Sequence, residues 1–465
     1  MHLVDYGLIL AYLALLLYLG LARRLKGSST TGELIIGGRA LTLPAFVASL
    51  VSTWYGGILG VGEYSFNHGL SNWLVFGVPY YLAAFLFALF LARKARESEV
   101  LTIPDRLAQA YDTRTAVAGS VIIYLMTIPA AYILMLGVLC QYLFGWPFWV
   151  GIVLGTFFSI CYVYLGGFSS VVRTDLLQFA LMFVGFAVLL IAVGVACGGL
   201  GFLRSALPAD HLTWHGGRSG WYVATWYFIA LATLIEPAFF QRCYAARNAG
   251  IARRGIFISI VCWALFDFLT TSCGLYARAV LPTLADPIGA YPALAMQILP
   301  AGLMGLFALA LLSTVMSTVD SYSFLAATTF GNDIVGRLRR LDAAGIMRYT
   351  RLGLVVSALL AVLLALFFRS VVDIWHVFGS IGTPALLLPV FFSFVGRRRL
   401  PPRMAMASIV LSGGISLVWF LSQYGTDSGD FWFGLQPIFP GLLCSLIIFI
   451  RYAQRSRDVL PGSKE

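Results

Sequence analysis

The chain has 465 residues, of which 60% are hydrophobic and only 11% are charged, and its formal net charge is +11. A soluble domain of average composition has about 25% charged residues, so this chain lacks the polar surface that a soluble enzyme or a disordered protein needs. Because a helix of about 20 apolar residues spans a bilayer, the composition predicts an all-α polytopic membrane protein.

The pattern of apolar residues predicts about 13 transmembrane helices, and residues 1–465 are expected to form a single transmembrane domain. The segments are 3–22, 42–65, 71–93, 117–144, 147–166, 174–198, 219–240, 254–277, 291–330, 349–368, 371–396, 404–423 and 433–452. The ninth is too long for one straight span, so we expect a turn within it near Pro292 or Pro300.

The basic residues are distributed unevenly between alternate loops. When the loops are assigned in turn to the two sides of a membrane, 27 of the 31 Lys and Arg residues fall on one side. Basic residues gather in cytoplasmic loops. The bias therefore predicts a cell (inner) membrane protein with its N-terminus outside and its C-terminus in the cytoplasm. It also explains the net charge without a nucleic-acid partner.

The cysteines and histidines show no pattern of a metal or redox site. The seven cysteines include no CxxC pair, and the five histidines include no HExxH motif. Cysteines in apolar runs usually act as small buried side chains. We therefore expect no metal-dependent enzyme, and because no nucleophile–base pair stands out either, we expect no enzyme of another kind.

No lysine lies inside an apolar segment, whereas several carboxylates fall in or at the ends of such segments, and the candidates for a functional role are Glu63, Asp175, Glu236, Asp267, Asp320 and Asp373. A charge at the bilayer centre costs at least about 2.5–3.5 kcal/mol, so such residues usually mark a functional site. An acidic interior favours a cation pathway. We take the following residues as candidates for a substrate pocket that would suit an amine or a zwitterion through charge and cation–π contacts: Trp54, Tyr55, Glu63, Trp226, Glu236 and Asp267.

Two apolar segments contain signals of a broken helix. The second carries four glycines and three hydroxyl residues between residues 49 and 63. This predicts an unwound stretch, although close packing of helices through small residues is an alternative. The seventh contains Glu236-Pro237, and proline interrupts a helix. Breaks five segments apart are typical of an inverted five-plus-five repeat.

The expected repeats are residues 42–198 and 219–396, and residues 404–452 are expected to add C-terminal helices.

The ninth segment is rich in oxygen donors between residues 313 and 321. Ser317, Asp320 and Ser321 are three and four residues apart and therefore share one helix face, and Thr314 lies one turn earlier. Hydroxyl and carbonyl oxygens suit a hard cation such as sodium. The alternative is that the hydroxyls bond back to carbonyls of the preceding turn.

The sequence resembles the sodium:solute symporter family over about residues 5 to 450. The resemblance is carried by the stretches Gly37-Gly38-Arg39, Tyr164 to Gln178 (YLGGFSSVVRTDLLQ), Gln241 to Ala246 (QRCYAA) and Ser317-Thr318. It implies a LeuT-type fold with extra helices at both ends, and transport by alternating access.

The resemblance also implies positions for sodium, the only cofactor expected. Ser52, Tyr55 and Thr314 would offer backbone carbonyls, and Ser317 and Thr318 would offer hydroxyls. A second sodium would use Asp175, Ser317, Asp320 and Ser321. Asp320 departs from the family, which has a neutral hydroxyl there, so it could strengthen the second site or carry a proton.

The sequence thus predicts a sodium-coupled secondary active symporter that imports a small organic solute, with the sodium ion between the broken second helix and the ninth. Two alternatives remain open. One is a proton-coupled transporter of the same fold that uses Asp175 or Asp320. The other is a transporter-like membrane sensor or a channel.

Overall fold

The computed structural model describes residues 1–21, 30–368, 371–396, 398–425 and 430–455; the side chain of Asp373 lies outside the described part. Eleven helices in these ranges are long and apolar enough to cross a membrane, and a shorter apolar helix follows them at Ile438–Tyr452. The prediction of an all-α polytopic membrane protein is confirmed, whereas the number of about 13 spans remains a prediction.

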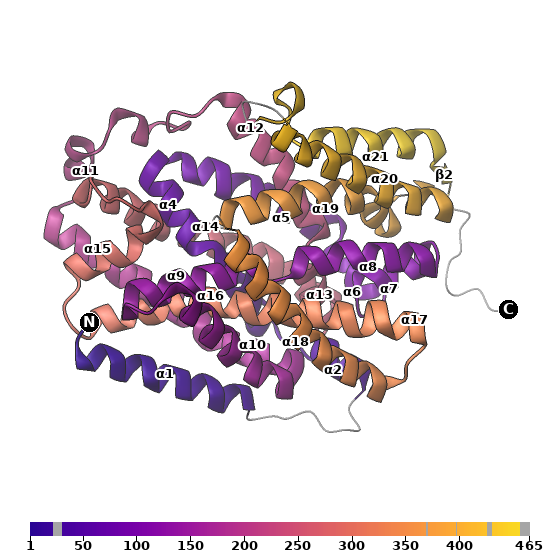
Figure 1. Cartoon of the computed structure of the whole chain (residues 1–465), viewed down its shortest axis with the longest axis horizontal. Coiled ribbons are helices and arrows are strands. Elements are labelled where there is room, and N and C mark those ends of the chain that lie inside the picture. Colours follow the sequence, from indigo (N-terminus) through magenta and orange to yellow (C-terminus); the bar gives the residue numbers. More distant parts are fainter. Residues whose placement is uncertain (22–29, 369–370, 397, 426–429, 456–465) are drawn as a thin grey trace.

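The described part consists almost entirely of helices (Figure 1). In the N-terminal half they are α1 (Leu3–Leu21), α2 (Thr31–Ile36), η1 (Gly37–Arg39), α3 (Leu43–Trp54), η2 (Tyr55–Gly57), α4 (Ile58–His68), η3 (Trp73–Gly77), α5 (Val78–Phe90), α6 (Ala92–Glu97), α7 (Ile103–Ala110), α8 (Thr113–Thr127), α9 (Ala130–Phe144), α10 (Phe148–Cys197), α11 (Leu200–Ala206) and η4 (Ala209–Leu212).

The second half continues with α12 (Gly220–Ile229), η5 (Ala230–Ile235), α13 (Pro237–Ala245), α14 (Ala249–Val280), η6 (Pro287–Gly289), α15 (Ala290–Ile298), α16 (Leu303–Thr328), η7 (Thr329–Gly336), α17 (Arg337–Arg339), α18 (Ala343–Phe367), α19 (Val371–Phe394), α20 (Pro402–Leu421), η8 (Ser422–Gly425), η9 (Trp432–Gly434) and α21 (Ile438–Tyr452). Two short strands, β1 (Arg398–Arg399) and β2 (Gln454–Arg455), pair in an antiparallel manner.

Both predicted helix interruptions are present. The first membrane-crossing unit after α1 runs from α3 through the 3-10 turn η2 into α4. The later unit runs from α12 through η5 to Glu236, which has an extended backbone, and restarts as α13 at Pro237. Proline suits the first turn of a helix, where its missing N–H leaves no bond unmade. Whether the two halves form an inverted repeat remains a prediction.

Two other predicted segments differ in detail. Segments 147–166 and 174–198 run together in α10, where Gly167 has a φ of 58° and a ψ of −151°. Glycine tolerates this conformation because it has no Cβ, and the change in direction there separates two membrane-length pieces. The ninth segment is divided into α15 and α16 between residues 299 and 302, which confirms the turn expected near Pro300.

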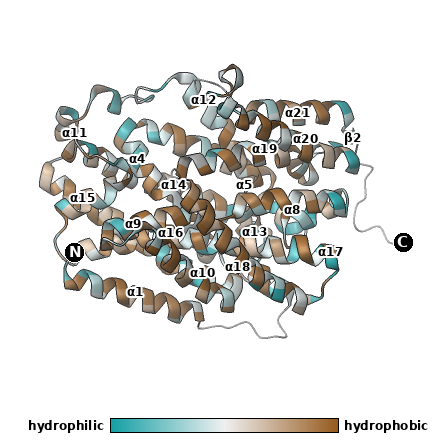
Figure 2. Cartoon of the chain, viewed as in Figure 1, coloured by the Kyte–Doolittle hydropathy of each residue, from teal (hydrophilic) through white to brown (hydrophobic). Residues whose placement is uncertain are grey.

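The helices differ sharply in how deeply they are buried. The unit α3–η2–α4 and helix α16 are buried along most of their length, whereas the apolar stretches of α1 and α10 are mostly half-buried or exposed. Figure 1 shows α1 along one edge and α20 and α21 at the opposite edge, with α16 between them. Apolar side chains such as Leu10 and Phe157 are each 68% exposed, and most helices consist largely of hydrophobic residues (Figure 2). Such a surface suits lipid, and the oxygen-rich helices lie in the protected interior.

Candidate functional site

The break in the second helix lies directly against α16. The hydroxyl of Ser317 donates a hydrogen bond to the carbonyl oxygen of Ser52 at 2.7 Å. The hydroxyl of Thr318 donates to the carbonyl oxygen of Thr53 at 2.8 Å, and its oxygen lies 3.5 Å from the carbonyl of Ser52. Oxygens from two buried elements therefore converge where the regular helix ends.

The carbonyl oxygen of Thr314 belongs to the same cluster. It lies 3.5 Å from the hydroxyl of Ser317 and 3.4 Å from that of Thr318. The structure thus brings together Ser52, Thr314, Ser317 and Thr318, four of the five residues expected around sodium. The fifth, Tyr55, is the first residue of η2, and its phenol donates to the carbonyl of Trp263 at 3.1 Å.

Close approach of the two elements depends on Gly56. A Cβ built at this position would overlap the side chain of Thr318. Glycine therefore allows the 3-10 turn to press against α16, and it also weakens the helix locally. The glycine cluster produces both effects, the break and the close packing, that were open alternatives in the sequence.

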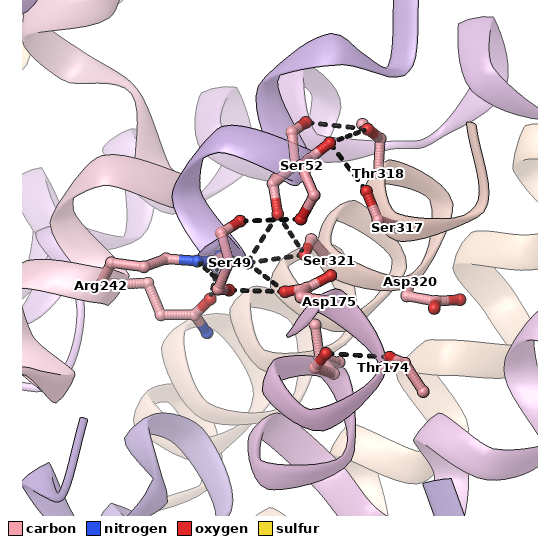
Figure 3. Close-up of polar contacts among 12 residues, drawn as sticks. Ser49, Ser52, Thr174, Asp175, Arg242, Ser317, Thr318, Asp320 and Ser321 are labelled. Atoms are coloured by element: carbon pink, nitrogen blue, oxygen red, sulfur yellow. Dashed lines mark hydrogen bonds and ion pairs between the residues drawn. The ribbon is translucent and has the colours of Figure 1, made fainter. Parts of the chain in front are cut away.

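Next to this cluster a buried arginine links three elements. Arg242 on α13 is fully buried and donates from Nη2 to the hydroxyls of Thr53 at 2.9 Å and Ser321 at 2.7 Å. Its Nε donates to Ser49 at 3.2 Å, and its Nη2 lies 3.7 Å from Oδ2 of Asp175 (Figure 3). The predicted segment 219–240 therefore ends too early. Helix α13 continues to Ala245 and places Arg242 inside the protein, whereas the prediction left it in the loop that follows.

The residues expected to form a second sodium site do not bond to a common set of partners. Asp175 accepts a hydrogen bond from Ser49 at 2.5 Å and pairs with Arg242, which also binds Ser321. Asp320 instead accepts hydrogen bonds from Ser159 and Tyr162 on α10. Figure 3 shows its carboxylate pointing away from Asp175 and Arg242.

A cavity of about 180 Å³ opens beside the two helix breaks. Its wall contains five of the six predicted pocket residues, Trp54, Tyr55, Trp226, Glu236 and Asp267. The sixth, Glu63, is half-buried on α4 and does not line the cavity. Further lining residues that sequence reasoning missed are Gly57, Phe76, Tyr80, Tyr132, Tyr322 and Trp375.

Each carboxylate of the cavity is held by a tyrosine. Oε1 of Glu236 accepts hydrogen bonds from the phenol of Tyr322 at 2.9 Å and from the backbone N–H of Ala238 at 3.4 Å. Asp267 on α14 accepts a hydrogen bond from Tyr81, whose phenol oxygen in turn lies 3.2 Å from the indole nitrogen of Trp73. The cavity therefore presents two carboxylates in an aromatic wall.

Comparison with known proteins places this architecture in a family. The model of the Sodium:solute symporter family matches residues 34–410. The chain belongs to this family. It is a family of transporters, and sodium is its coupling ion.

Curated relatives resemble the chain over nearly its whole length. The sodium/pantothenate symporter of Escherichia coli (strain K12) is 24% identical, and the similarity covers 91% of this chain and 88% of that protein. The sodium/proline symporter of Staphylococcus aureus (strain JH9) is 23% identical, with 96% and 91% covered. The solutes in these names differ, so they do not identify the solute of this chain.

Solved structures show the same fold. A Na+-coupled sialic acid symporter matches with a TM-score of 0.79 and 18% identity, covering 98% of this chain and 100% of that one. MHP1, a nucleobase-cation-symport-1 family transporter, matches with a TM-score of 0.62 and 10% identity, covering 92% and 96%. The chain therefore has the LeuT-type fold.

Proposed function

We propose that the chain imports a small organic solute together with sodium by alternating access, and that sodium binds between Ser52 and the Ser317–Thr318 pair. The observation that carries this proposal is the convergence of backbone carbonyls from the helix break with two hydroxyls of α16. Hard cations prefer such oxygen ligands. An ion among these oxygens would hold the broken helix against α16.

The position of the cavity supports coupling between sodium and the solute. Trp54, Tyr55 and Gly57 line the cavity and directly follow Ser52 and Thr53 in the chain. A sodium ion that fixes the backbone at the break would therefore also order this wall of the cavity. The solute would bind more tightly to that state, and reciprocally would strengthen sodium binding.

One sodium ion is enough to drive useful accumulation. A charge that moves through 100 mV releases about 2.3 kcal/mol, and a tenfold sodium gradient adds about 1.4 kcal/mol. Together these would sustain a solute gradient of several hundredfold.

Proton coupling is the second candidate, and the surroundings of Asp320 favour it. Its carboxyl is fully buried and is bonded to the hydroxyls of Ser159 and Tyr162, and no basic side chain bonds to it within the described ranges. Asp175, the other acid considered for this role, is instead paired with Arg242.

Transport by the purified full chain in liposomes separates the two candidates. A panel of labelled amines, amino acids and carboxylates is offered with an inward sodium gradient, with a pH gradient, or with potassium in place of sodium. We expect concentrative uptake of at least one compound with the sodium gradient. Uptake that follows the pH gradient and is unaffected by sodium would select proton coupling, whereas ion flux without solute uptake would select a channel.

A pair of variants tests the position of the sodium site. In the Ser317→Ala/Thr318→Ala double variant, both hydroxyls are lost, so the sodium concentration for half-maximal uptake should rise at least about tenfold while the amount of folded protein stays similar. Ser323→Ala is the matched control, because Ser323 is equally buried on α16 but its hydroxyl makes no hydrogen bond to any described residue. Unchanged sodium dependence in the double variant would contradict the proposed site.

A further inference from the structure

The wall of the cavity has a marked charge bias. It contains the carboxylates of Glu236 and Asp267, and no Lys or Arg is among its described lining residues. Of these lining residues, His376 is the one that could carry a positive charge, and its Nε2 lies 2.6 Å from Oε1 of Gln436. The nearby Arg242 does not line the cavity and is already bound to Asp175, Ser49, Thr53 and Ser321.

A series of neighbouring aromatic rings extends from the carboxylate of Glu236 along the cavity wall. The phenol of Tyr322 binds it directly, and the ring of Tyr132 lies 5.1 Å from that of Tyr322. The ring of Trp375 lies 6.3 Å from that of Tyr132, and all three line the cavity. Trp54 and Tyr80, with centroids 5.5 Å apart, add a second pair of lining rings.

Both hydrogen bonds to Glu236 reach the same oxygen. Tyr322 and Ala238 donate to Oε1, and Oε2 accepts no hydrogen bond within the described part of the chain. The carboxylate lies at the interruption between η5 and α13, where Glu236 has an extended backbone. A ligand in the cavity can therefore use the second oxygen without displacing an existing partner.

We infer that the solute is an organic cation without a carboxylate, whose ammonium group binds at Glu236 among the rings of Tyr132, Tyr322 and Trp375. A positive group is attracted both by the carboxylate and by the faces of aromatic rings. A zwitterion would bring its own carboxylate into a cavity whose described lining holds two acids and no Lys or Arg, which is unfavourable in a poorly solvated site. This inference rests on the proposed function, because it assumes that the cavity is the solute site of the transporter.

Matched compounds separate charge from shape. Choline is compared with 3,3-dimethylbutan-1-ol, its neutral carbon isostere, and with glycine betaine, its zwitterionic counterpart; phenethylamine is compared with phenylalanine. Binding to the full chain in lipid nanodiscs is followed in sodium through tryptophan fluorescence, because Trp54, Trp226 and Trp375 line the cavity. We expect at least one of the two ammonium probes to bind at least about tenfold more tightly than its neutral or zwitterionic counterpart.

The Glu236→Gln variant tests the assigned residue. Removal of one partner of a buried charge pair should weaken binding of that ammonium probe by at least about 30-fold. Glu97→Gln is the matched control, because Glu97 is an exposed acid on α6 that pairs with Arg93 and does not line the cavity. Equal or tighter binding of the zwitterionic and neutral probes, no binding of either ammonium probe, or an unchanged preference in Glu236→Gln would each overturn the inference.

A sodium titration without solute keeps this test separate from the proposed function. If sodium changes the fluorescence but the ammonium preference is absent, the inference alone fails. If the ammonium probes bind as expected but sodium has no effect on the fluorescence or on their affinity, the proposed coupling fails and the solute class stands.

Discussion

Single residues decide whether the broken helix and α16 can meet. Gly56 makes room for Thr318, and the neighbouring Gly57 makes room for the ring of Trp375 in the cavity wall. The hydroxyls of Ser317 and Thr318 then reach carbonyls of the break. A small change of volume at this point therefore alters both the candidate sodium site and the cavity.

The Gly56→Ala variant should lose the response to sodium. The added methyl group would overlap the side chain of Thr318, which must then move away from the break. The measurement is the rise in melting temperature of the purified protein when potassium is replaced by sodium. Gly60→Ala is the control, because its Cβ would lie no closer than 3.7 Å to Trp375. An equal sodium response in Gly56→Ala and the native chain would show that this close approach is not required.

Some residues of the candidate site could be predicted from the sequence, and others could not. The hydroxyls of α16 and the glycines of the break are polar or small residues in an apolar run, which is a strong local signal in a membrane protein. Arg242 was missed because it follows a proline-interrupted helix and was assigned to a basic loop. Its neighbours Cys243 to Ala246 are apolar, and this was the signal that the helix continues. Trp54, Tyr55 and Trp226 were predicted beside polar residues, whereas the other aromatic residues of the cavity, such as Tyr80 and Tyr132, gave no such signal, because rings are common in lipid-facing helices.

At the scale of elements, the interior is held by polar links between broken and continuous helices. Arg242 connects α13 to Ser49 and Thr53 on α3, to Asp175 on α10 and to Ser321 on α16. The interruptions could be predicted because glycine and proline act locally. The partner of each polar side chain depends on how helices far apart in the sequence pack against one another. For this reason the sequence could not predict that Asp175 and Asp320 bond to different partners.

The Arg242–Asp175 pair should behave as a buried ion pair. Arg242→Met or Asp175→Asn alone should each lower stability by about 3–5 kcal/mol, because each leaves an unpaired charge inside the protein. The double variant should lose less than the two single losses combined. Melting temperatures of the four proteins measure this coupling. Additive losses would show that the two side chains act independently, and Arg93→Gln, at an exposed pair on α6, should have no measurable effect.

At the scale of the whole molecule, composition alone predicted the all-α membrane class, and the charge bias predicted its orientation. The helices described here agree with the predicted segments in order and approximate bounds. They differ from the 13 predicted segments in two places, because α10 joins two of them and α21 is shorter than the other candidate spans. Because the distribution of basic residues predicts which loops face the cytoplasm, the orientation of the protein in the membrane can be tested directly.

Cysteine labelling in intact cells tests the orientation. A membrane-impermeant maleimide should label Ser205→Cys, which lies in α11 on the predicted outer side, and should label Ala344→Cys only after the cells are opened. Both positions are exposed. The unmodified chain, with its seven native cysteines, provides the background. Labelling of Ala344→Cys alone in intact cells would reverse the orientation.

The most direct test of the central claim is equilibrium binding of 22Na+ to the purified protein without solute. We expect saturable binding by the native chain and by Ser323→Ala, and loss of that binding in Ser317→Ala/Thr318→Ala. Saturable binding of equal affinity in the double variant, with its fold intact by melting temperature, would contradict a sodium ion held between the helix break and α16.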